Sequence, residues 1–338
     1  MLSRVANSIF WANRYIERAE NYARFIDVNF NLSLDLTPDL PEQWGPLVIT
    51  TGDWDLFKEF HENPTRENVI YFLTFDKNNP NSILNCIHKG RENARTFRES
   101  ITREIWEQIN NLYFLVNEGF NSKIWTKNRA SRDFFHQIRN DCQLIYGIEE
   151  STISRMEGWH FGCMGRYLER ADKTSRLLDV KYHYILPSVK LVGTTLDMLH
   201  WTALLKSVSA FNMYRRAYGK IVPQNIVEFL LMNRYFPRSI WFSINQAEKS
   251  LAFLSDHPVN GNGTNPAAKK MGMLRSEIEF ADINDIFMKG LHEHLDETQK
   301  KINQISDTIY TNFFTINPQN SQQQTTSDST QTQSQSSN

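Results

Sequence analysis

The segment WANRYIERAENYARFIDV, at residues 11–28, returns in the second half of the chain as CMGRYLERADKTSRLLDV, at residues 163–180. Eight of the eighteen aligned positions are identical, and both copies contain an Arg-Tyr pair, one aliphatic residue and then Glu-Arg-Ala. A match at one fixed spacing is typical of a repeated structural unit. The sequence therefore predicts that a helical block is duplicated within this chain.

Further matches follow these segments at a slightly larger spacing, which indicates an insertion of the kind that loops tolerate. We expect two pseudo-symmetric helical halves, residues 1–150 and 151–316, packed as one large bundle about a pseudo-twofold axis. The matched pairs include Trp44 and Trp201, Leu47 and Leu204, Asn68 and Asn225, Pro80 and Pro237, and Ser82 and Ser239.

The spacing of apolar residues predicts an all-α fold. Apolar side chains recur every three or four residues, and alternating runs of β-branched residues joined by two-residue turns are missing from the sequence. Proline and other turn-forming residues predict loops at residues 29–46 and 256–266. Residues 317–338 are rich in Gln, Ser and Thr and lack apolar side chains, so we expect a disordered tail.

The composition excludes several classes of protein. Of 338 residues, 37 are Lys or Arg and 38 are Asp or Glu, and this balance gives no overall electrostatic attraction to nucleic acid or to an anionic membrane. The three cysteines, Cys86, Cys142 and Cys163, are too far apart to indicate a disulfide framework or a thiolate metal site. The sequence also lacks an apolar run of membrane-spanning length and a leader pattern, so we expect a cytoplasmic protein.

Each copy of the duplicated segment places charged residues on one arc of its helix. Each arc contains more cations than anions, and two interpretations follow. The arcs form a structural salt-bridge network between the halves, or they line a cleft that binds a carboxylate or phosphate through arginine forks. The general behaviour of helix charges favours the network. The arcs contain Arg14, Glu17, Arg18, Asn21 and Arg24 in the first copy, and Arg166, Glu169, Arg170, Lys173 and Arg176 in the second.

A second row of arginines, Arg91, Arg95 and Arg98, has the spacing of one helical face. The corresponding stretch of the other half, residues 243–254, lacks these arginines. A purely symmetric packing role predicts them in both halves, so the row is a candidate for a function confined to one half. Thr102 is expected to cap the helix that follows.

The usual motifs for cofactors and metals are missing from the sequence. No glycine-rich phosphate loop of either common pattern occurs, and the GNG at residues 261–263 is interpreted as a turn. His292 and His294 lie too far apart around a helix to bind one metal ion, so no metal and no cofactor is expected. Cys163 with His160 resembles a nucleophile with its base, but a buried packing cysteine is the favoured interpretation.

Several segments resemble the bacterial alpha-E family. RYIERAE and RYLERAD resemble its ER motif, and FLTFDKNNPNSI, GRENARTFRESITREIWEQIN and FLLMNRYFPRSI are similar to its other signatures, over residues 1–315. The resemblance implies an all-helical domain. It also implies a peptide-synthesis or peptide-modification system, because members are typically encoded beside ATP-grasp amide ligases, transglutaminase-like cysteine proteases and proteasome-like hydrolases.

Three functional hypotheses remain open. The first is an accessory or scaffold subunit that docks an ATP-grasp-type ligase or a transglutaminase-like protein, or presents an anionic peptide or small molecule. The second is an acyl- or amide-transfer enzyme, which requires Arg14, Glu17 and Arg18 in a pocket open to solvent. The third is a structural protein that associates with further copies of itself.

Overall fold

The computed structural model describes residues 1–35, 44–184, 194–255 and 265–315, and the regular elements in these ranges are all helical. The all-α prediction is therefore confirmed. The first half contains α1 (Ser3–Asp35), α2 (Gly45–Thr51), α3 (Trp54–Phe60), α4 (Arg66–Thr74), α5 (Ile83–Thr96), the 3₁₀ turn η1 (Arg98–Ser100), α6 (Arg103–Asn121), the 3₁₀ turn η2 (Ile124–Thr126) and α7 (Asn128–Thr152). The second half contains α8 (Glu157–Tyr184), α9 (Thr195–Ser207), α10 (Phe211–Tyr218), α11 (Pro223–Met232), α12 (Ile240–Ser255), α13 (Pro266–Glu279), α14 (Ile283–Lys289), α15 (Leu291–Ile309) and the π-helical turn η4 (Tyr310–Phe314).

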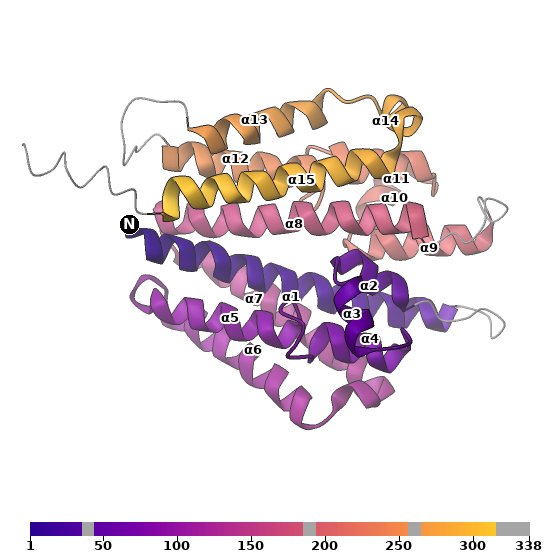
Figure 1. The fold of residues 1–338 in the computed structure, drawn as a ribbon, viewed down its shortest axis with the longest axis horizontal. Coiled ribbons are helices and arrows are strands. Elements are labelled where there is room, and N and C mark those ends of the chain that lie inside the picture. The colour runs from indigo at the N-terminus through magenta and orange to yellow at the C-terminus, as the bar shows by residue number, and fades with distance from the viewer. Residues whose placement is uncertain (36–43, 185–193, 256–264, 316–338) are drawn as a thin grey trace, which may run out of the picture.

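Two long helices, α1 and α8, lie side by side through the middle of the molecule (Figure 1). On one side α1 packs against α5 and α7, and on the other side α8 packs against α12 and α15. The outer pairs, α5 with α6 and α12 with α13, complete the two halves. This parallel packing is what a duplication would produce, although common ancestry of the halves stays a prediction.

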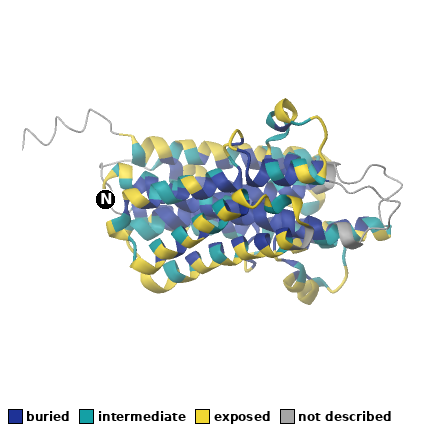
Figure 2. Ribbon diagram, turned by 90° about the horizontal axis from the view of Figure 1, so that it is seen from below, coloured by how far each residue is buried: buried dark blue, intermediate teal, exposed yellow. Residues whose placement is uncertain are grey.

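Because α1 and α8 are each covered by neighbours, most of their side chains are buried, including polar ones (Figure 2). The two helices also approach closely. A Cβ atom added to Gly165 of α8 would lie 2.3 Å from the backbone oxygen of Phe10 in α1. Only glycine fits at this crossing, because real Cβ atoms essentially never come within 3.0 Å of such an atom.

Several helices begin where the sequence places a capping side chain. Thr102 accepts a hydrogen bond from the backbone N–H of Ile105, which confirms the predicted cap of α6. Thr65 and Ser82 cap α4 and α5 in the same way. Trp44 and Trp201 are buried at 2% and 3% exposure, as core anchors should be.

The predicted loop at residues 29–46 is wrong at both ends. Helix α1 continues to Asp35, and α2 already begins at Gly45 with Pro46 in its first turn. Packing explains the longer helix, because Phe30 on the extension contacts the ring of Trp44 edge-on at 5.3 Å between centroids. Residues 36–43 and 256–264 of the two predicted loops, and the predicted tail at 317–338, lie outside the described residues.

The last residues of the second predicted loop belong to a helix start. Asn265 caps α13, and Pro266 is the first residue of that helix. None of the helices in the described ranges combines the length and the hydrophobicity needed to cross a bilayer.

Replacing Gly165 with Ala should destabilise the protein by about 1–3 kcal/mol or more, because the added methyl group forces α1 and α8 apart. Gly147, on the exposed face of α7, is the matched control, since a Cβ atom there meets nothing within 4 Å. Gly147→Ala should stabilise the protein by roughly 0.5–1 kcal/mol. Urea unfolding of both variants checks this, and equal effects would contradict the close crossing.

Candidate functional site

The charged arcs of α1 and α8 face each other across the helix crossing and exchange partners. Glu17 of α1 is bound by Arg170 of α8, with distances of 2.8 and 2.9 Å from Nε and Nη2 to the two carboxylate oxygens. Glu169 of α8 is bound by Arg18 of α1 in the same two-pronged way, at 2.6 and 3.0 Å. The Glu-Arg pair of each repeated segment therefore binds the Glu-Arg pair of the other.

Each of these carboxylates also has further cationic partners. The Nε of Arg14 donates to Glu169 at 2.9 Å, and the ammonium of Lys173 lies 3.5 Å from the same carboxylate. Arg238, which precedes α12, donates to Glu17 at 3.2 Å. Both carboxylates are fully buried, at 0% exposure. A buried carboxylate needs such partners because its unpaired charge would be very costly.

The interactions continue along both helices. Arg238 also binds the buried carboxylate of Glu20, which pairs with Arg24 as well. On α8, Asp172 accepts from Lys173 and Arg176, each at 3.0 Å. We call this whole set the ER network. Its members are Arg14, Glu17, Arg18, Glu20, Arg24, Glu169, Arg170, Asp172, Lys173, Arg176 and Arg238.

The network keeps its two central carboxylates ionised. Burial alone would raise the pKa of Glu17, but the charges of Arg170 and Arg238 outweigh it and hold that pKa far below its usual range. Burial opposes ionisation of Glu169 too, and Arg18 and Lys173 lower its pKa well below normal. Carboxylates in this state are poor proton acceptors, so neither is suited to general base catalysis.

The geometry favours the structural interpretation of the arcs over an open anion-binding cleft. The enzyme hypothesis required Arg14, Glu17 and Arg18 in a pocket open to solvent. Arg14 is 6% exposed, Glu17 is fully buried and the side chain of Arg18 is 13% exposed. The two pockets found among the described residues contain none of the three. Their charges are used by partners inside the protein.

Three arginines of the predicted arcs lie toward the ends of the two helices. Arg24 is 1% exposed and donates to the hydroxyl of Ser209, besides its pair with Glu20. Arg166 lies 3.4 Å from Glu149 and 3.5 Å from Glu150, both near the end of α7. Arg176 pairs with Asp172 of the same helix at 3.0 Å.

The second arginine row does not join this network, and its predicted geometry is wrong. Helix α5 ends at Thr96, so Arg98 falls in η1 and is not on the same helical face as Arg91 and Arg95. The chain turns here because Phe97 is buried in the core. The three side chains therefore do not form the single helical row that the spacing predicted.

The arginines of this row share two neighbours. Arg91 and Arg95 both pair with Glu92, at 3.1 and 3.2 Å, and Arg91 and Arg98 both lie over the ring of Trp106. Arg91 donates to Asn110 at 2.7 Å and lies over the ring of Tyr113. Arg98 donates to the carbonyl oxygen of Ile101 and lies over Trp106. Arg95 has a side chain 69% exposed and pairs only loosely with Glu92 at 3.2 Å. Arg91 and Arg98 thus link the end of α5 and η1 to α6.

The other residues examined in the sequence do not form a catalytic or metal site. Cys163 is buried, and burial raises the pKa of its thiol to about 11, so it is not a ready thiolate. His160 stacks on Phe253 with 3.9 Å between ring centroids. His292 pairs with Asp179 at 2.6 Å. Among the described residues, no group of three or more His, Cys, Asp or Glu side chains is arranged to hold a metal ion.

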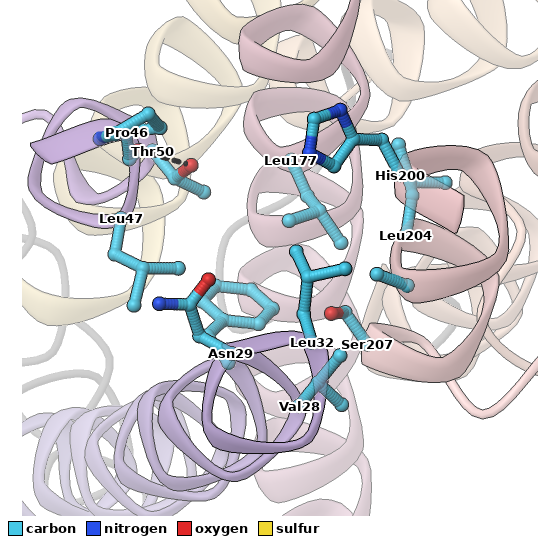
Figure 3. A pocket seen from close by; sticks show the side chains of 12 residues that line it. Val28, Asn29, Leu32, Pro46, Leu47, Thr50, Leu177, His200, Leu204 and Ser207 are labelled. Carbon is cyan, nitrogen blue, oxygen red and sulfur yellow. Dashed lines mark hydrogen bonds between the residues drawn. The ribbon is translucent and has the colours of Figure 1, made fainter. Parts of the chain in front are cut away.

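Two pockets open on the surface at the two ends of the central helix pair. The first has about 530 Å³ of empty space and lies between α1, α2, α8 and α9. Figure 3 shows its wall of aliphatic side chains, among them Leu32, Leu47 and Leu177, with the amide of Asn29 and the hydroxyl of Ser207 at its edge. The second has about 450 Å³ and lies where α7, η1 and the first turns of α1 and α8 meet.

Sequence reasoning missed Glu20 and Arg238, which are central to the network. A signal for Arg238 was present in the alignment. It stands between Pro237 and Ser239, just as Asn81 stands between Pro80 and Ser82. Asn81 accepts a hydrogen bond from Arg18, so both aligned positions reach the network from the start of the following helix.

Comparison with known proteins agrees with this description. A model of the Alpha-E family, described as a predicted alpha-helical domain with a conserved ER motif, matches residues 1–314. Uncharacterised proteins of Mycobacterium bovis and Mycobacterium tuberculosis are 22% identical over 279 residues, which is 78% of this chain. The match spans only 31% of the length of those relatives. No solved structure matches this chain.

Replacing Glu17 or Glu169 with Gln should each lower the free energy of unfolding by about 3–5 kcal/mol, because the change leaves buried arginines without their counter-ion. Glu107, exposed and paired with Arg103, is the matched control, and Glu107→Gln should change stability by less than about 0.5 kcal/mol. Urea unfolding measures all three. Small losses in the buried variants would show that the network contributes little.

Acid should weaken the protein through the same two carboxylates. Their pKa values are lowered by folding, so their stabilisation is fully present above the unfolded value of about 4.5 and is lost as the pH falls below it. Each contributes a slope of about 1.4 kcal/mol per pH unit in that acidic window. The unfolding free energy of Glu169→Gln, measured between pH 7 and pH 3, should therefore fall less steeply than that of the wild type. An identical slope would refute the assignment.

Proposed function

The chain belongs to the Alpha-E family of helical domains with an ER motif, and from this premise we propose that it acts as a non-catalytic subunit that docks another protein. One observation carries the proposal. The charged residues of the ER motif bind each other in the interior and so hold the two halves together. A motif used in this way builds a rigid platform and leaves the chemistry to a partner.

The partner that we propose is an ATP-grasp-type amide ligase, with a transglutaminase-like protein as the second candidate. The resemblance to alpha-E proteins, which are typically encoded beside such enzymes, supports this choice. The lengths of the mycobacterial relatives also support it, because the matched region makes up only 31% of each of them. A helical unit that is joined to other sequence in its relatives is expected to work beside another domain. Because such a ligase consumes ATP, we place the pair in the cytoplasm.

The surface most suited to docking lies at one end of the second half. Tyr235, Phe280 and Met288 are 87%, 83% and 77% exposed, and we call these three residues the apolar patch. Arg234 and Glu279, which precede the two aromatic residues, are joined by a salt bridge of 2.8 Å. Helix α14, which carries Met288, packs against α11 and α15 (Figure 1). Large exposed apolar side chains are typical of protein-binding sites, and the salt bridge between Arg234 and Glu279 brings the segments that carry Tyr235 and Phe280 together.

The double variant Tyr235→Ser and Phe280→Ser should weaken association with an ATP-grasp-type ligase encoded beside this protein by roughly tenfold or more, because aromatic anchors dominate such interfaces. Phe114→Ser is the matched control. Phe114 is 62% exposed on α6 of the other half and should leave binding unchanged. Surface plasmon resonance gives the affinities, and thermal unfolding checks that both variants remain folded.

Three outcomes would count against the proposed function. The wild-type protein fails to bind the ligase or to alter its turnover, the double variant binds as well as the wild type, or the patch mediates only association between copies of this chain. Light scattering at several protein concentrations identifies the last case.

A further inference from the structure

The second pocket, at the start of α1 and α8, has properties that packing alone does not explain. It has about 450 Å³ of empty space, part of it continuous with solvent. Its wall is largely apolar, with Ile9, Phe97, Ile101, Ile153 and Trp159 among the lining residues. Apolar pockets commonly bind small molecules when a few polar groups are fixed within them.

One polar group in the wall, the side chain of Asn13, is buried and incompletely bonded. Asn13 is 5% exposed, and its Nδ2 donates to the carbonyl oxygen of Ile9 at 3.2 Å. Its Oδ1 has no hydrogen-bond partner among the described residues. A buried amide oxygen without a donor is unfavourable, so a ligand that supplies a donor would recover the lost free energy.

A glycine on the facing helix gives this amide its room. Gly162 of α8 also lines the pocket, and a Cβ atom added there would lie 2.9 Å from Nδ2 of Asn13. Any larger residue at position 162 would displace the amide. Because Gly162 has no side chain, the amide of Asn13 can stay in the pocket wall.

The second polar group is the carboxyl group of Glu149, near the end of α7. Its side chain is 18% exposed, and Arg166 lies 3.4 Å from it. Arg166 also serves Glu150, at 3.5 Å, and Glu150 is bound by Arg155 at 2.7 Å. Burial raises the pKa of Glu149, and the neighbouring charge of Glu150 raises it further, while the charge of Arg166 and a hydrogen bond with the Asn13 side chain lower it.

We propose that this pocket binds a primary ammonium group carried on a small apolar body. The ammonium would donate hydrogen bonds to Oδ1 of Asn13 and to the carboxylate of Glu149, and the apolar body would lie against Phe97, Ile101 and the other apolar lining residues. Asn13 Oδ1 and Glu149 are acceptors and one is an anion, which matches three N–H donors with a positive charge. The indole N–H of Trp159 in the same wall is a buried donor without a partner among the described residues, and a peptide ligand could supply an acceptor for it.

Two sources could supply this chemistry, a free alkylamine or the amino terminus of a peptide that begins with an apolar residue. The proposal is independent of the docking function, because the second pocket and the apolar patch share no residue. A failure of one leaves the other intact.

The test is isothermal titration of the full-length protein with n-hexylamine and with its neutral counterpart n-hexanol. The amine should bind at least about tenfold more tightly than the alcohol, because a charge-assisted hydrogen bond to a carboxylate is stronger than one from a neutral hydroxyl. The dipeptide amide Leu-Gly-NH₂ and its N-acetylated form are titrated in parallel. Binding of the free dipeptide with loss on acetylation identifies a peptide terminus as a source, and binding of hexylamine alone identifies a free amine. Both results support the proposal.

Two variants test the residues. Glu149→Gln should weaken amine binding by about tenfold or more, whereas Glu107→Gln, on the exposed face of α6 and outside the pocket wall, should leave it within about twofold. Ser100→Phe places a ring at the exposed rim and should block binding without disturbing the core. Ser100→Phe also tests the proposal if Glu149→Gln does not fold. Equal affinity for amine and alcohol, absence of binding by both hexylamine and the dipeptide, or unchanged binding in both Glu149→Gln and Ser100→Phe would overturn the proposal.

Discussion

The structure depends on one exchange, in which each central helix supplies the counter-ion for the other. Glu17 is bound by Arg170 and Glu169 by Arg18, all within the crossing of α1 and α8. A carboxylate with no exposed surface can be tolerated only where its partners are held in good geometry. This requirement fixes the relative shift and rotation of the two helices, since a displacement of one helical turn would separate both pairs. The packing of α5 and α7 on one side and of α12 and α15 on the other follows from that crossing.

The two halves are alike in outline but divide the additional cations unequally. Where the first segment has Asn21, the second has Lys173, and where the first half has Asn81, the second has Arg238. Lys173 lies beside Glu169 on its own helix, whereas Arg238 crosses to Glu17 and Glu20 of the other half. The second half therefore supplies one additional cation to each carboxylate, and Arg14 of the first half supplies another to Glu169. At the corresponding positions of the first half, the neutral amide of Asn21 donates to Glu17 and that of Asn81 accepts from Arg18.

Much of the fold could be predicted from the sequence, because the all-α class, the cap at Thr102 and the buried Trp44 and Trp201 depend on local spacing and side-chain chemistry. The boundaries were harder. Helix α1 runs past residue 29 because Phe30 gains a contact with Trp44 that local propensity does not contain. The arcs could be predicted as charged faces, but their partners could not. Arg238 reaches Glu17 across more than two hundred positions in the chain, and a helical wheel carries no information on contacts at that separation.

The exchange of counter-ions has a consequence for how the polypeptide acquires its shape. A fragment ending after α7 would contain Glu17 without Arg170 and Arg238, and a fragment beginning at α8 would contain Glu169 without Arg14 and Arg18. Neither fragment can complete its own interior, so the two must meet before either becomes fully ordered. Each half of the chain thus needs the other half in order to fold completely. Two separately synthesised fragments would be expected to recognise each other with high selectivity, as the strands of a split reporter do.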